Sequence, residues 1–97
     1  MIKDAEIAMV NAATFALDYQ DKHYNADAAE IIKQFMSESN HLGIKSDIKI
    51  YAISAINEII KIKRDKANKG KNNKQLMQLF MKISPEISRR IKEEDDY

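Results

Sequence analysis

The residues of this chain with the clearest chemical potential are cations crowded into one segment. Residues 61–74 contain one acid, no aromatic residue and seven basic residues, namely Lys61, Lys63, Arg64, Lys66, Lys69, Lys71 and Lys74. Cations at this density can neutralise phosphates of a nucleic acid or pair with acidic side chains of a protein. Because bases have no aromatic ring to stack on, duplex contact is better supported than single-strand binding. A solvated lysine-rich loop is the third interpretation.

The other reactive residue types indicate no catalytic or metal site. The chain has no cysteine, which excludes a thiolate metal site, a disulfide scaffold and a cysteine nucleophile. His23 and His41 are the only imidazoles, each in a polar loop or at a helix end, and Gly70 stands alone among lysines rather than in a phosphate-binding loop. Acidic side chains lie mostly at helix ends or on polar faces, where nothing would tune a pair for acid-base work. We therefore expect no enzyme, no bound metal and no cofactor.

A second segment is a candidate for nucleic-acid binding. Residues 76–91 contain Ile-Ser-Pro and Ile-Ser-Arg-Arg elements, and this pattern resembles the helix-turn-helix of DNA-binding repressors. The resemblance covers less than a fifth of the chain, with Lys82 in place of the usual turn glycine and an interval after Ser84 that is one residue short. It implies a second helix in the major groove, although the missing residue rotates that helix by about 100°. Arg89 and Arg90 are the candidate contacts.

The elements that would position these residues are helical throughout. Apolar residues recur at three- and four-residue spacing, and capping residues separate the resulting stretches. We predict an all-α fold, a small five-helix bundle or orthogonal bundle, with a long third helix at its centre. The predicted helices run over about 3–20, from a cap at Asn25 or Asp27 to Gly43, from Ser46 toward Lys69 before the Gly70 stop, from Asn72 or Asn73 to 83, and from Ser84-Pro85-Glu86 onward.

The third helix is predicted to bury about half of its circumference. Ile53, Ile56 and Ile59 fall in the apolar arc and are expected in the core, which should end near Ile62. Ile50 lies outside the arc and is a candidate surface anchor.

Composition and charge describe one domain with two unlike halves. Its 97 residues fit one domain over 1–92, followed by an acidic tail over 93–97 that should fray. Residues 1–40 carry three basic and seven acidic side chains, whereas residues 41–97 carry thirteen and eight. This charge asymmetry makes a homodimer a candidate. The first helix is lined with alanines, which suit close packing either within the monomer or against a symmetry mate. No apolar run is long enough for a membrane span, so a cytoplasmic protein without membrane contact is expected.

The favoured function is a small non-enzymatic regulator or inhibitor that acts through a protein partner. The alternative is a nucleic-acid-binding regulator that uses residues 61–74 and the degenerate helix-turn-helix-like segment 76–91. A structural homodimer is the third hypothesis.

Overall fold

The computed structural model describes residues 2–23, 25–42 and 46–95. They form four α-helices, α1 (Ile2–Lys22), α2 (Ala28–Leu42), α3 (Ser46–Arg64) and α4 (Asn73–Asp95), with a short 3₁₀ turn, η1 (Lys66–Asn68), between α3 and α4. No strand occurs in these ranges, so the all-α prediction is confirmed. No helix in them combines the length and apolarity needed to cross a membrane.

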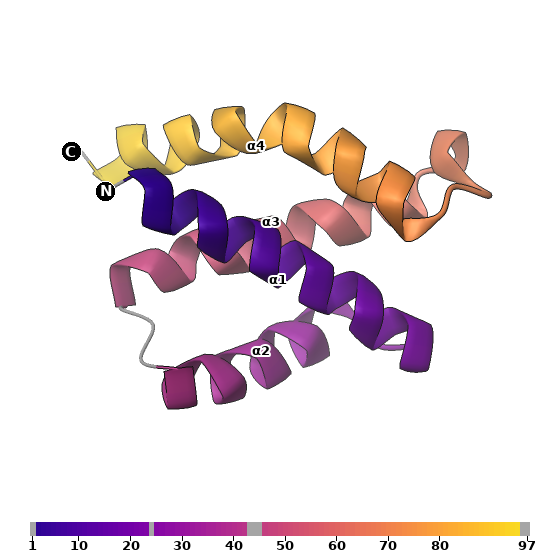
Figure 1. Ribbon diagram of the computed structural model, residues 1–97, viewed down its shortest axis with the longest axis horizontal. Coiled ribbons are helices and arrows are strands. Elements are labelled where there is room, and N and C mark those ends of the chain that lie inside the picture. Colours follow the sequence, from indigo (N-terminus) through magenta and orange to yellow (C-terminus); the bar gives the residue numbers. More distant parts are fainter. Residues whose placement is uncertain (1, 24, 43–45, 96–97) are drawn as a thin grey trace.

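The helices run back and forth along the long axis of a molecule that measures 38 × 28 × 20 Å. Helices α1 and α3 cross in the middle, with α2 on one side of the pair and α4 on the other (Figure 1). Both α1 and α3 contact each of the other helices. We expected a long third helix at the centre. Helix α1 shares that place with α3, and α4, with 23 residues, is the longest of the described helices.

Small side chains let α1 lie close against its neighbours. Its inward face carries five buried alanines, Ala5, Ala8, Ala12, Ala13 and Ala16. The larger Met9 and Leu17 are buried among them and join the main hydrophobic cluster. The alanine face is therefore used inside the monomer, which takes this support away from the homodimer hypothesis.

The buried face of α3 follows the predicted arc with one exception. Ile56 and Ile59 are fully buried, whereas Ile53 is only half-buried. At 100° per residue, Ile53 lies at the edge of the arc defined by the buried residues, so the prediction of a core position was wrong there. Ile50 is 41% exposed, on the surface as predicted.

The fourth and fifth predicted helices are one helix, so the count of five was wrong. Pro85 lies inside α4 and has no N–H to donate to the carbonyl of Met81 four residues earlier. The hydroxyl of Ser84 donates to that carbonyl instead, at 3.2 Å. Leu76 and Phe80 before the proline and Ile87 and Ile91 after it are all buried, so packing along one face holds the helix continuous.

The continuous helix also removes the turn on which the helix-turn-helix resemblance depends. Residues 76–91 have no second helix set at an angle to the first. The backbone of α4 runs on through Asp95, beyond the boundary predicted at residue 92, and fraying of the acidic tail stays a prediction. Residues 96–97 and the predicted terminator Gly43 lie outside the described residues.

Candidate functional site

The segment between α3 and α4 is held by hydrogen bonds from its own side chains. Asp65 accepts from the backbone N–H of Ala67 at 2.9 Å, and the side-chain amide of Asn68 donates to the carbonyl of Ile62 at 2.9 Å. These bonds satisfy groups that continued helix would have used, so α3 ends at Arg64 and not near Lys69 as expected. Gly70 then takes a φ of +90°, a conformation that favours glycine.

A reciprocal capping box fixes the start of α4. The N–H of Gln75 donates to the side-chain oxygen of Asn72 at 2.9 Å, and the N–H of Asn72 donates to the side-chain oxygen of Gln75 at 3.0 Å. Asn72 is thus the cap, one of the two candidates from the sequence. Both ends of the connection have defined backbone geometry.

Asp21, near the end of α1, joins this connection to the rest of the molecule. Its carboxylate accepts a hydrogen bond from the side-chain amide of Asn73 at 2.7 Å and lies 3.8 Å from the ammonium of Lys63. The charge of Lys63 is therefore partly compensated inside the protein. This cation differs from the other six in the segment.

The remaining six cations form an exposed cluster, here called the basic end: Lys61, Arg64, Lys66, Lys69, Lys71 and Lys74. Of the seven cations in residues 61–74, all of which the structure describes, only Lys63 forms a salt bridge. They lie on the last turn of α3, on the α3–α4 connection and on the first turn of α4. This connection projects at the opposite end of the long axis from the start of α1 (Figure 1). Its one acid, Asp65, is a cap. Among the described residues no carboxylate forms a salt bridge with these six cations, so the basic end carries a net positive charge.

Lys74 stands where the helix itself disfavours a cation. It lies in the first turn of α4, and that turn has no acidic residue. The positive end of a helix dipole destabilises a nearby cation by a few tenths of a kcal/mol. Lys61, Lys63 and Arg64 are in the favourable last turn of α3. The position of Lys74 therefore does not stabilise α4 through the helix dipole.

Arg89 and Arg90 are not brought together with the basic end. They lie in the second half of α4, and their guanidinium groups are 4.0 and 3.8 Å from the carboxylate of Glu86. Both are exposed. The candidate contacts from the sequence thus form two groups. The six cations of the basic end have no salt bridge, whereas Arg89 and Arg90 pair with Glu86.

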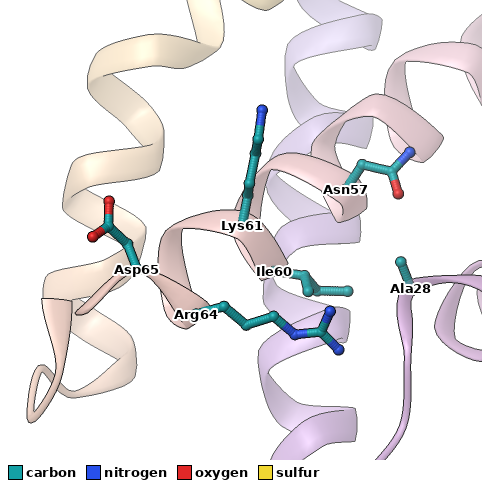
Figure 2. A pocket seen from close by; sticks show the side chains of 6 residues that line it. All are labelled: Ala28, Asn57, Ile60, Lys61, Arg64 and Asp65. Carbon is teal, nitrogen blue, oxygen red and sulfur yellow. The ribbon is translucent and has the colours of Figure 1, made fainter. Parts of the chain in front are cut away.

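A cleft adjoins the basic end between α2 and α3. Its volume is about 440 Å³, and its lining residues are Ala28, Asn57, Ile60, Lys61, Arg64 and Asp65. Figure 2 shows Arg64 and Asn57 extending toward Ala28, while the carboxylate of Asp65 points to the opposite side. Ile60 is buried beneath them and gives the cleft an apolar floor.

Four of these lining residues, Ala28, Asn57, Ile60 and Asp65, were not among the candidate contacts from the sequence. Asn57 lies four residues before Lys61 and seven before Arg64, a spacing that puts all three on adjoining parts of one helix face and could have singled it out. Ala28 carries no such signal, because only the packing of α2 on α3 brings it to the cleft.

A second cleft, between α1 and α2, has aromatic and acidic walls. Phe15, Asp18, Tyr19, Lys22, Gln34 and Glu38 line its volume of about 290 Å³. The hydroxyl of Tyr19 donates to Glu30 at 3.0 Å. Desolvation, then that hydrogen bond and the negative charge of Glu30, raise the pKa of Tyr19 above its usual value. The ring of His23 lies tilted by 35° against that of Tyr19, with centroids 4.6 Å apart.

In the part of the chain that the structure describes, no three His, Asp or Glu side chains lie close enough together to hold a metal ion. Comparison of the chain with protein-family models, with curated proteins and with solved structures gives no match. The basic end and its adjoining cleft are therefore the candidate binding features of this protein.

Proposed function

We propose that this protein is a small non-enzymatic regulator or inhibitor that binds an acidic surface of a protein partner through its basic end. The observation that carries the proposal is the group of six exposed cations without a salt bridge, which lie on the end of α3, the start of α4 and the connection between them. Capping hydrogen bonds fix the backbone of that connection. A fixed backbone lowers the conformational entropy lost on binding. Uncompensated charge speeds encounter with an acidic partner.

The decisive experiment compares three forms of the protein as bait in a lysate of the native host treated with nuclease. One is the parent; one has Lys66, Lys69, Lys71 and Lys74 replaced by glutamine; the control carries Lys33→Gln, Lys82→Gln and Lys92→Gln. The control positions are exposed and lie outside the basic end. We expect a protein that the parent and the control retain and that the basic-end variant loses. Equal retention by all three baits would refute docking through the basic end.

A nucleic-acid-binding regulator is the second candidate, and the same cations favour it. Six uncompensated charges could each meet a phosphate, whereas segment 76–91 adds no helix-turn-helix because it is one helix. Duplex binding would weaken with salt, with a slope of log affinity against log salt of about −0.9 for each phosphate contact. Fluorescence anisotropy with a labelled DNA duplex measures that slope. No binding at roughly 50 mM salt, where screening is weakest, would exclude this candidate.

We also propose a cytoplasmic location, since a chain without cysteine suits a reducing compartment. A homodimer is a further proposal, now supported by exposed Ile50 and by the opposite charges of the two halves. Sedimentation at micromolar concentration tests it, and a monomer there removes it.

A further inference from the structure

The geometry points to the cleft between α2 and α3 as a receptor for a glutamate or aspartate side chain of the partner. Arg64 binds the carboxylate of that side chain, and the adjoining backbone of the partner lies beside Asn57. This inference rests on the proposed function. It goes beyond general attraction to the basic end because it assigns one residue as the specific anchor. The occupant is an acidic peptide segment that also carries apolar side chains.

The charge of the cleft favours an anion. Arg64 forms no salt bridge, and Asp65 beside it uses its carboxylate to cap the 3₁₀ turn at 2.9 Å from the N–H of Ala67. Asp65 also points to the opposite side of the cleft from Arg64 (Figure 2). Ala28 is the first residue of α2, and the N-terminus of that helix is already capped by Asp27 and has Glu30 in its first turn. The attraction for an anion therefore comes from Arg64 and Lys61, and a carboxylate in the cleft meets the guanidinium of Arg64.

The remaining walls favour a peptide over a phosphate backbone. Ile60 is 4% exposed and forms an apolar floor with the half-buried Ala28, against which the methylene groups of a glutamate can pack. Asn57 offers both an amide donor and a carbonyl acceptor, which together match the C=O and N–H of a peptide. A phosphodiester backbone has only acceptors and would leave the carbonyl of Asn57 unused.

The shape of the guanidinium provides the specificity. Arg64 can make two parallel hydrogen bonds to one carboxylate, whereas a lysine at the same place supplies a point charge. The loop lysines Lys66, Lys69 and Lys71 supply such charges outside the cleft. Replacement of Arg64 by lysine therefore separates a carboxylate receptor from a diffuse positive field, because the net charge does not change.

The test is fluorescence anisotropy of a short labelled peptide of alternating glutamate and leucine, with the glutamine version of the peptide and a labelled DNA duplex as comparison probes. We expect Arg64→Lys to weaken binding of the acidic peptide about tenfold, the loss of roughly one charge-assisted hydrogen bond. Ala28→Glu should weaken it at least as much, because the new carboxylate occupies the receptor while suiting the N-terminus of α2. Lys71→Gln is the control and should cost only about twofold, as expected for an exposed charge.

The outcomes separate the two levels of the proposal. If the acidic peptide binds but Arg64→Lys binds as tightly as the parent, the receptor is refuted and docking through the basic end stands. If Ala28→Glu leaves affinity unchanged, the cleft is likewise excluded as the place of binding. If the duplex binds and the acidic peptide does not, both the receptor and the acidic protein partner are overturned. Circular dichroism of each variant confirms that the helices are intact.

Discussion

Three isoleucines on α3 provide a test of the fold in which only burial differs. Ile56 is fully buried, Ile53 is half-buried and Ile50 is 41% exposed. Each can be replaced by alanine, so the change in helix propensity, a gain of a few tenths of a kcal/mol, is common to all three. We therefore expect the destabilisation to follow burial, with Ile56→Ala the largest and Ile50→Ala the smallest.

The size of the effect follows from the burial. Ile56→Ala removes three buried carbons, about 2.4 kcal/mol at 0.8 kcal/mol for each methylene, and the cavity raises the total to as much as about 5 kcal/mol. In a domain of this size that lowers Tm by at least about 10 °C. Ile50→Ala should stay within about 1 kcal/mol of the parent, because its side chain is 41% exposed and the gain in helix propensity offsets part of the lost burial.

Urea denaturation followed by far-UV circular dichroism measures all three variants against the parent. An unchanged slope of free energy against urea would establish that the differences are in stability rather than in the denatured state. Equal losses for Ile50→Ala and Ile56→Ala would contradict the orientation of α3, and with it the placement of Asn57 and Arg64 on its outer face.

Three further predictions concern single contacts. Pro85→Ala should stabilise the protein by about 2 kcal/mol, the helix penalty of proline less the entropy it removes from the unfolded chain; Ser84→Ala should cost about 1 kcal/mol in the parent and much less beside Pro85→Ala, a coupling that a double-mutant cycle in urea detects. Asp21→Ala should lower the free energy of unfolding by no more than about 1 kcal/mol in thermal melts, because its ion pair with Lys63 is exposed. A loss of several kcal/mol would mean that the contacts of Asp21 with Lys63 and Asn73 are needed for the fold. The raised pKa of Tyr19 predicts stability that is full below pH 10.0, its usual value, and is lost as pH rises through the folded pKa; Tyr19→Phe should remove that loss in alkaline melts, and an unchanged alkaline profile would contradict it.

Local capping signals in the sequence identified helix starts where the capping groups lie close along the chain. Asp27 accepts from the N–H of Glu30 at 2.9 Å, and Asn72 caps α4, each one of the two residues predicted. Capping signals gave a wrong prediction at Ser84 and Pro85, whose residue types suit a helix start although α4 continues through them. Side chains on both sides of the proline are buried against α1 and α3, and this packing keeps the helix continuous.

Some parts of the candidate site could be predicted from local sequence and others could not. The cations of residues 61–74 are evident from composition, and their exposure follows from their charge. The pairing of Lys63 with Asp21 spans more than forty residues of chain, and the position of Ala28 beside Arg64 requires the packing of α2. Contacts between distant elements leave no local spacing in the sequence, so these parts of the site could come only from the structure.

The placement of the helix ends has a practical consequence for valency. Helix α1 begins and α4 finishes at the same end of the 38 Å long axis, and the connection with the basic end lies at the other (Figure 1). A tether attached before α1 or after α4 leaves the basic end unobstructed, so the protein can be immobilised by either route with its cations facing the solution. Two copies fused in tandem through a flexible linker would present two basic ends. Their joint affinity for a partner with repeated acidic segments would be set by the effective concentration that the linker allows.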